Sequence, residues 1–476
     1  MLNAVCLMFA LTLGSANALL ARLTAVSTLA VGQIRTPRWV DRAFQAILMG
    51  ITVFFATAWV TADGWTSLAV LVLALWLAAM MLRLAGQWLV GVLTEEQRVR
   101  AAIAAIDKPG PHTPRFAFYF SAPDLNRPTH VLMWYQYLLA LGIPFVIILR
   151  EQKHLKAFPD VSDVPVVFVR KAAELNNVLP SGVRTVFYAN NGQKNRFMVK
   201  NYPDAMHIQL LHGDSDKPPS YSPMSKIYSK LFVAGQMAVD RYAQNGVHIP
   251  TERFRVVGRP QVSKIRQTRA KTQVSRRKVA YMPTWRGFFA DTQFSSLERA
   301  LDVVACVQGL KHPAGMLFKP HPMSYKDPLW PSLARQIRQE LAKGRPFGST
   351  YFGDETDPFD VYNNADVLIT DISSVMIDFL YSGKPYLVIK PAGFGEDDLA
   401  RFPSMKGGYL VNADLSNLSE QLALALGDDP MHEQRLITRN YAFGDISQPP
   451  GAAFRSACLE VLDIAEPCTA AELECA

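Results

Sequence analysis

The fold of this chain is decided by Ala365–Pro391, which reads ADVLITDISSVMIDFLYSGKPYLVIKP. Asp366–Thr370 is a short apolar and β-branched run, which is typical of a buried parallel strand. The polar tetrad Asp371-Ile372-Ser373-Ser374 ends this strand and begins a helix, which Gly383 ends. Tyr386–Ile389 is then the next strand, so the stretch predicts a strand-helix-strand unit.

Two serines stand at the N-terminus of the predicted helix. Backbone N–H groups at this end have no partner within the helix and carry a partial positive charge. Ser373 and Ser374 are therefore placed where a phosphate or diphosphate binds. The alternative is an ordinary N-cap, because Asp and Ser are favoured capping residues in any helix. The tetrad alone leaves both interpretations open.

The composition limits the possible partners and the compartment. The 476 residues are enough for two or three domains, and the net charge of +8 suits phosphorylated substrates or an anionic membrane face. The five cysteines are scattered and without a Cys-x-x-Cys spacing, so they predict neither a disulfide framework nor a structural zinc site. We therefore expect a reducing compartment.

The first 95 residues are strongly apolar and predict membrane-spanning helices. Met1–Ala21 contains no charged residue, Phe44–Thr61 is a second uncharged run, and Ser67–Leu82 is a third. Because a spanning helix needs about 20 apolar residues, the second and third runs fit a hairpin across a bilayer. The first run is either a retained span, which we favour, or a cleaved signal. A buried helical subdomain is the alternative for all three runs.

Basic residues flank these runs, and the hairpin tip carries Asp63 instead. The flanking arginines are Arg22, Arg35, Arg38, Arg42, Arg98 and Arg100. By the positive-inside rule both basic flanks are cytoplasmic. We therefore expect a multi-pass protein of the plasma membrane whose remaining residues are cytoplasmic.

Beyond residue 111, predicted strands alternate with predicted helices, which favours parallel sheets with helices on both faces. We divide this part into a Rossmann-like domain at 112–260, a basic linker at 261–278 and a second Rossmann-like domain at 279–465. The linker is a solvated connector or, alternatively, a segment that binds anionic headgroups or a polyanionic acceptor. The expected fold class is α/β, with two Rossmann-like domains preceded by an N-terminal membrane-spanning helical region.

Four polar clusters each follow a predicted strand. They are His212-Gly213 with Lys217, Thr284-Trp285-Arg286, Lys319 with His321, and Asp371 with Ser373 and Ser374. Singly, each has a structural alternative, such as a turn residue at a strand end. Because ligands of open α/β sheets bind outside the carboxyl ends of the strands, we expect the clusters to form one site. They lack a group of carboxylates for Mg²⁺, so we expect a nucleotide diphosphate held by donors, with no metal and no cofactor.

These clusters resemble the ordered motifs of the CDP-glycerol glycerophosphotransferase family, which contains the teichoic acid primases and polymerases. The matching stretches are His212-Gly213, Pro283-Thr284-Trp285-Arg286, His321-Pro322 and Ile369–Phe379, within about residues 205–465. The resemblance implies two facing domains of the glycosyltransferase-B type, with CDP-glycerol bound mostly by the second. It implies transfer of glycerol phosphate to a hydroxyl of a lipid-linked (poly)glycerol phosphate acceptor, with CMP leaving, at the inner face of a bacterial plasma membrane.

The resemblance also implies roles for individual residues. His212 matches the histidine proposed as general base on the acceptor hydroxyl, and an ordinary histidine pKa of about 6.5 suits that task. His321 matches the second histidine, which would donate to the diphosphate as CMP leaves. Asp378 is expected to be structural. The expected substrate-binding residues are Gly213, Lys217, Thr284, Arg286, Lys319, Asp371, Ser373 and Ser374.

The sequence departs from the family pattern at two places. Asp214-Ser215 stands where Thr-Pro is usual, and Ile372 stands where Tyr is frequent. The acceptor and the polyol therefore stay open, and a CDP-ribitol phosphotransferase or a membrane-anchored nucleotide-sugar glycosyltransferase is the alternative function. A non-catalytic scaffold is a third reading, against which the two histidines argue. Nucleic acid is not an expected partner, because the basic residues gather without interleaved aromatics.

Overall fold

The computed structural model describes residues 80, 97–159, 164–267, 277–287, 293–395 and 398–463. The chain divides into two units, Met1–Ala105 and Ile106–Ala476, and both sheets belong to the second unit. Apart from residue 80, the spans expected within residues 1–95 lie outside the described residues. Among the helices that are described, none combines the length and the apolarity needed to cross a bilayer.

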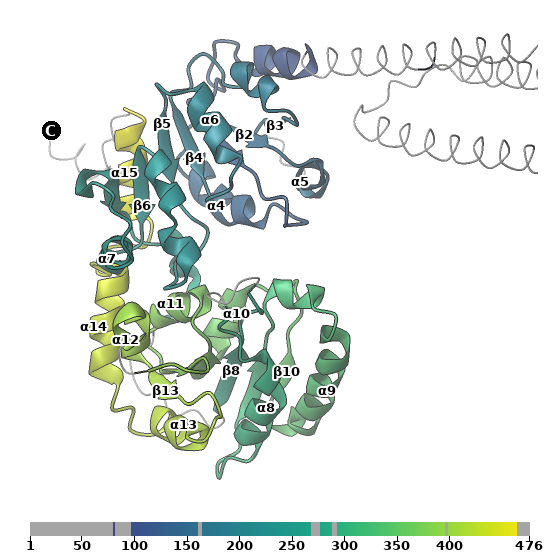
Figure 1. The fold of residues 1–476 in the computed structure, drawn as a ribbon, viewed down its shortest axis with the longest axis vertical. Helices are drawn as coiled ribbons and strands as arrows, with labels where there is room; N and C mark the ends of the chain where they lie inside the picture. The colour runs from purple at the N-terminus through teal and green to yellow at the C-terminus, as the bar shows by residue number, and fades with distance from the viewer. Residues whose placement is uncertain are drawn as a thin grey trace, which may run out of the picture. The chain divides into compact units, whose positions relative to one another are not determined.

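The first sheet has seven parallel strands in the order β3-β2-β1-β4-β5-β6-β7. The strands are β1 (Phe116–Phe120), β2 (Phe145–Leu149), β3 (Val166–Phe168), β4 (Thr185–Tyr188), β5 (Met206–Gln209), β6 (Lys230–Val233) and β7 (Phe254–Val256). The helices between them are α4 (Thr129–Leu139), α5 (Gln152–Ala157), α6 (Asn195–Asn201) and α7 (Gln236–Gln244). β1 and β2 are fully buried apolar runs, as expected of central parallel strands. Figure 1 labels β2 to β6 of this sheet.

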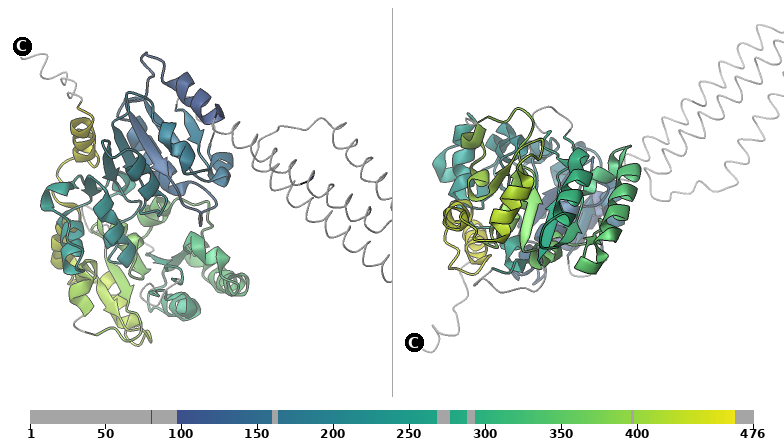
Figure 2. Two further views of the ribbon diagram at one scale, coloured as in Figure 1. Left: turned by 45° about the horizontal axis from the view of Figure 1, so that its top comes forward. Right: turned by 90° about the horizontal axis from the view of Figure 1, so that it is seen from below.

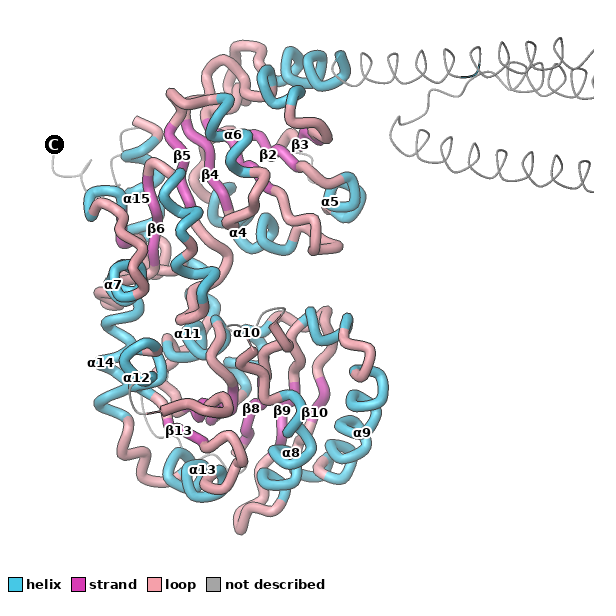
Figure 3. The backbone as a smooth tube through the Cα atoms, viewed as in Figure 1, coloured by secondary structure: helices cyan, strands magenta, loops and turns pink. Residues whose placement is uncertain are grey.

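The second sheet has six parallel strands in the order β10-β9-β8-β11-β12-β13. The strands are β8 (Lys278–Met282), β9 (Gly315–Phe318), β10 (Thr350–Tyr351), β11 (Val367–Thr370), β12 (Tyr386–Ile389) and β13 (Tyr409–Val411). The helices are α8 (Ala300–Gln308), α9 (Trp330–Lys343), α10 (Pro358–Asn364), α11 (Ser374–Leu380), α12 (Asp398–Arg401), α13 (Leu418–Leu426), α14 (His432–Phe443) and α15 (Ala452–Val461). Figure 3 distinguishes these helices and strands from the loops that carry the polar clusters.

Short 3₁₀ helices complete the described structure. They are η1 (Ala173–Asn177), η2 (Pro218–Tyr221), η3 (Pro223–Ile227), η4 (Thr251–Arg253), η5 (Pro260–Lys264), η7 (Leu297–Arg299), η8 (Pro322–Lys326), η9 (Arg345–Phe347) and η10 (Pro403–Gly407). In each sheet the chain starts at a central strand, adds strands on one side and then continues on the other side. This change of side falls between β1 and β4 in the first sheet and between β8 and β11 in the second. The expected α/β class with parallel sheets is confirmed, and both sheets have the doubly wound order of a Rossmann fold.

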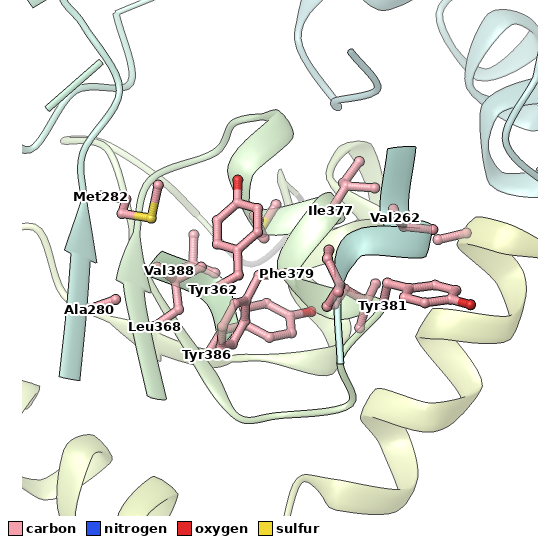
Figure 4. Packing of buried hydrophobic residues seen from close by; sticks show 14 of the residues in the cluster. Val262, Ala280, Met282, Tyr362, Leu368, Ile377, Phe379, Tyr381, Tyr386 and Val388 are labelled. Atoms are coloured by element: carbon pink, nitrogen blue, oxygen red, sulfur yellow. The ribbon is translucent and has the colours of Figure 1, made fainter. Parts of the chain in front are cut away.

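Alternate residues of the second sheet enter two separate cores. Val279 and Tyr281 pack with α8, α9 and α13, whereas Ala280 and Met282 pack with α10 and α11 on the opposite face. Figure 4 shows the second of these cores, where Phe379 of α11 lies close to Tyr386 of the sheet. The side-chain period of two along a strand produces this division.

The last helices connect the second sheet back to the first. α14 packs on α7, where the backbone of Ala442 and Phe443 leaves no room for a Cβ at Gly235. α15 then joins the core of the first sheet through Phe454 and Cys458, and it lies beside the teal strands in Figures 1 and 2. The expected second domain at 279–465 thus ends in a helix that completes the first domain.

The segment expected as a basic linker, 261–278, is ordered at both of its ends. η5 buries Gln261 and Val262, and Lys278 is the first residue of β8. Residues 268–276 lie outside the described residues. Apolar contacts of Val262 and Ile265 in the second core therefore hold the start of this segment.

Candidate active site

The first histidine of the site follows β5 in a strained turn. Leu211 has a φ of 54°, which is uncommon for a residue other than glycine. Two hydrogen bonds hold this turn: the Leu211 N–H donates to Gln209 Oε1 at 2.9 Å, and Trp134 Nε1 donates to the Leu211 carbonyl at 2.6 Å. Strain that the surroundings hold in place is concentrated at functional sites, and here it positions His212.

The hydrogen bonding of His212 assigns its tautomer. Its Nδ1 lies 3.2 Å from the carbonyl oxygen of Ala189, which follows β4. Because a carbonyl oxygen only accepts, Nδ1 carries the proton, and Nε2 of the neutral ring carries a lone pair. Burial, against the hydrogen bond to Ala189 and together with the positive charge of Arg259, lowers the pKa of His212 to about 4. The ring is therefore neutral at pH 7, with Nε2 able to accept a proton.

The second histidine has the opposite tautomer. His321 caps η8, and its Nδ1 accepts a hydrogen bond from the Met323 N–H at 3.1 Å. The proton of the neutral ring is therefore on Nε2, which is a donor. Burial first, and then positive charge on Lys217, His212 and Lys319, together lower the pKa of His321 to about 3. The pKa of His321 therefore responds to charge on Lys217 and His212, which belong to the first domain.

A lysine joins the first domain to the second beside these rings. Lys217 Nζ donates to Thr284 Oγ1 at 2.9 Å. The Thr284 N–H donates in turn to Asp371 Oδ2 at 2.8 Å, and the Ser296 N–H donates to the same oxygen at 3.2 Å. Thr284 follows β8 and Asp371 follows β11, the two adjacent strands between which the strand order changes side. The polar groups therefore gather at the switch point, where open α/β sheets bind ligands.

Burial changes the ionisation of this lysine and this carboxyl. It lowers the pKa of Lys217 to about 8, against the opposing effect of Asp371. It raises the pKa of Asp371 to about 6, against the effect of its hydrogen bonds and of Lys217. Asp371 Oδ1 is buried and has no hydrogen-bond partner among the described residues, so it is available to a bound ligand.

The two serines of the tetrad contribute differently. Ser373 precedes α11, but its side chain makes no capping hydrogen bond, and its buried Oγ has no partner in the described part of the chain. An ordinary N-cap role is therefore not what its geometry shows. Ser374 instead contacts the loop of the first domain: a Cβ at Gly213 would lie 3.2 Å from Ser374 Cβ. Glycine at this position permits a close approach of the two domains.

Two expected cations are already paired. Lys319 Nζ donates to the Gly353 carbonyl at 2.8 Å, and burial lowers its pKa. Arg286 is half exposed, with its Nη2 2.7 Å from Glu298 and its Nε 3.7 Å from Asp327. The Arg286 guanidinium must therefore leave carboxylates in order to bind a phosphate, which the sequence did not indicate.

A buried ion pair fixes the His212 loop to α11. Arg259 donates to both oxygens of Asp378, from Nε at 2.5 Å and from Nη2 at 3.1 Å. The same Nη2 lies 3.4 Å from the His212 carbonyl oxygen. The structural role expected for Asp378 thus includes a bond that links the two domains.

A second buried network accounts for the unusual residue after His-Gly. Asp214 and Asp216 both bind the buried guanidinium of Arg241 on α7. Asp216 Oδ2 also accepts a hydrogen bond from the Ser404 N–H of η10 at 3.0 Å. Asp214 therefore has an arginine partner within this chain, and the network extends into the second domain.

Sequence reasoning missed one imidazole. The ring of His130, in the first turn of α4, lies parallel to the ring of His212, with 3.6 Å between centroids and 4° between planes. The available signal was its position: His130 follows β1 as the other clusters follow their strands. No motif surrounds it, and the contact joins residues far apart in the sequence.

The described residues contain no group of three or more His, Cys, Asp or Glu side chains arranged to hold a metal ion. The groups that converge are two neutral imidazoles, a lysine, a threonine, a carboxyl and a serine hydroxyl. Such a set binds and orients an anionic substrate and moves a proton. Fold and site together define a two-domain α/β enzyme with a two-histidine site.

The family model described as CDP-Glycerol:Poly(glycerophosphate) glycerophosphotransferase matches residues 252–393. This segment is less than half of the chain, and within it the match supports the resemblance seen in the sequence and the expected glycerophosphotransferase class. The matched residues include Thr284, His321 and Asp371, whereas His212, Gly213 and Lys217 precede them. No curated protein matches the chain by sequence.

Solved structures with a similar fold have low sequence identity. The wall teichoic acid polymerase TagF is 15% identical, with 78% of this chain and 94% of that chain covered and a TM-score of 0.48. A glycosyltransferase from Rickettsia africae is 15% identical, with coverages of 73% and 98% and a TM-score of 0.46. Anabaena HepE, solved with UDP and glucose, is 10% identical, with coverages of 73% and 99% and a TM-score of 0.45.

Proposed function

We propose that the protein transfers glycerol phosphate from CDP-glycerol to a hydroxyl of a lipid-linked (poly)glycerol phosphate acceptor and releases CMP. The observation that carries this proposal is the pair of opposite tautomers, with a proton acceptor at His212 Nε2 and a proton donor at His321 Nε2. The family match supports the donor. The product is a polymer of the teichoic acid type.

In the proposed reaction the acceptor hydroxyl gives its proton to His212 Nε2 and attacks the phosphorus atom that carries glycerol. The bond between this phosphorus and the bridging oxygen of the diphosphate breaks, and CMP leaves with the electron pair. His321 Nε2–H donates a hydrogen bond to the diphosphate as negative charge develops on the CMP phosphate. The proton taken by His212 passes to solvent after the product leaves.

A pKa of about 4 makes His212 a weaker base than an ordinary histidine. The negative diphosphate of a bound donor raises the pKa of a nearby imidazole. Donor binding therefore raises the basicity of His212 when the acceptor is present. Asp371 Oδ1 and Ser373 Oγ, buried without partners in the described structure, then gain hydrogen bonds from or to the donor.

We place the reaction at the cytoplasmic face of a bacterial plasma membrane, with the catalytic residues on two domains of the glycosyltransferase-B type. The support for the membrane is the charge-poor composition of residues 1–95 and the arginines on both flanks.

The test is CMP release by the full chain in detergent, given CDP-glycerol and a lipid-linked glycerol phosphate acceptor. We expect His212→Ala to lower the acceptor-dependent rate by about 100-fold or more, because a general base contributes that much, with donor affinity nearly unchanged. His248→Ala is the matched control, since His248 is an exposed histidine of the same domain, and it should keep the wild-type rate. An active His212→Ala variant would contradict the assigned base. Turnover of CDP-ribitol or a UDP sugar, with none of CDP-glycerol, would refute the proposed donor.

A further inference from the structure

His130 packs directly against the proposed base. Its ring covers one face of His212, and the edge of Phe120 approaches its own ring at a centroid distance of 5.8 Å and an angle of 76°. Its Nδ1 is buried and has no hydrogen-bond partner among the described residues. A phenylalanine would make the same stack without this nitrogen, so this substitution separates the effect of the stack from any effect of the nitrogen.

The stack constrains the proposed base in two ways. With a parallel ring at 3.6 Å, the imidazole of His212 can rotate about its Cβ–Cγ bond only if the His130 ring moves as well. The orientation that remains is the one in which Nδ1 reaches the Ala189 carbonyl and Nε2 is free. The neighbour also keeps water from one face of the His212 ring, and burial of that kind disfavours the protonated form.

Burial and neighbouring groups also affect protonation of the stacked pair. Burial lowers the pKa of His130 well below its ordinary value, and His212, His154 and His321 lower it further. A proton on one ring disfavours a proton on the other, so the two rings titrate as a pair. The charged and titratable groups around them are Arg259 with Asp378, His321 with Lys217, and His154 with Glu151.

We propose that His130 is a positioning residue for the transfer reaction: its ring, stacked on His212, holds that imidazole in the plane that leaves Nε2 free for the acceptor hydroxyl. The inference rests on the proposed function, because it takes His212 as the base. It adds a residue of α4, outside the matched family segment, to the machinery of the first domain.

The first experiment compares His130→Ala with His130→Phe in the full chain by acceptor-dependent CMP release from pH 5 to pH 9. His130→Phe keeps the stack, so its kcat should stay within about threefold of wild type with an unchanged acid limb. His130→Ala admits water to the His212 ring, so the His212 pKa rises towards its ordinary value of about 6.5. Its kcat should fall by about tenfold or more at pH 6 and recover partly at pH 8, with KM for CDP-glycerol unchanged. Equal pH profiles for His130→Ala and wild type would overturn the proposal.

The second experiment does not depend on activity. Diethyl pyrocarbonate modifies unprotonated imidazoles, and the rate at His212 is measured by peptide mass spectrometry as a function of pH. We expect His130→Ala to accelerate modification at His212 about tenfold and to raise its pH midpoint, with His248 as the internal control. Unchanged modification of His212 would overturn the stack as its constraint. If His212 shows the expected modification pattern but the protein has no transfer activity, the proposed function is refuted and the role of the stack is kept.

The activity of His130→Phe distinguishes the ring stack from the ring nitrogen. Loss of activity in His130→Phe as complete as in His130→Ala would show that a ring nitrogen acts directly, and so would also overturn the proposal.

Discussion

Removal of one partner of the Arg259–Asp378 pair should destabilise the protein strongly. Both side chains are buried, at 7% and 10% exposure, and two hydrogen bonds join them. Asp378→Asn keeps the shape of the carboxyl but leaves the guanidinium without its counter-charge. Breaking a buried ion pair in this way costs about 3–5 kcal/mol.

That magnitude corresponds to a clear shift of the thermal midpoint. At roughly 2 °C per kcal/mol for a large domain, Asp378→Asn should unfold about 6–10 °C below wild type in a calorimetric or dye-based melt. The double variant Arg259→Met with Asp378→Leu removes both charges and should recover a large part of this loss, because apolar replacement of a buried pair is often nearly neutral.

The control is an ion pair of the same type on the surface. Arg255 and Glu460 lie 2.7 Å apart at 50% and 63% exposure. Such a pair contributes about 0–1 kcal/mol, so Glu460→Gln should shift the midpoint by about 2 °C or less. A similar small shift in Asp378→Asn, or additive losses in the double variant, would refute the view that this pair holds the two domains together.

Two further predictions concern the residues between the domains. The pKa of Asp371 is about 6 in the folded protein and 3.8 in the unfolded chain. The contribution of this carboxyl to the free energy of unfolding is therefore fully present below pH 3.8 and is lost as the pH rises through 6. Asp371→Asn should therefore gain about 2 kcal/mol over wild type between pH 4 and pH 7 in urea unfolding, and parallel pH profiles would contradict this. Gly213→Val should lower the unfolding free energy by about 1–3 kcal/mol, because a Cβ there lies 3.2 Å from Ser374 Cβ. Ser374→Gly in the same chain should restore part of the loss, and no restoration would place the clash elsewhere.

Local patterns in the sequence were sufficient for the elements of the sheets. The strand, helix and strand expected in Ala365–Pro391 are β11, α11 and β12, because apolar runs, a polar break after the first strand and a glycine after the helix act over a few residues. The order of strand ends also predicted that Thr284 and Asp371 would lie together, and a hydrogen bond joins them.

Contacts between distant residues were beyond the reach of these patterns. The stack of His130 on His212 depends on the packing of α4 against the ends of β4 and β5, which no local signal specifies. The carboxylates beside Arg286 come from η7 and from the end of η8, so its pairing depends on how these turns meet. Asp214 looked like a departure from a motif, and its arginine partner on α7 became visible only in three dimensions.

The return of α15 to the first sheet limits when the first domain can complete its core. During synthesis the strands of the first sheet leave the ribosome long before Phe454 and Cys458, which fill part of their core. Until α15 has been made, the apolar surface that this helix covers stays open.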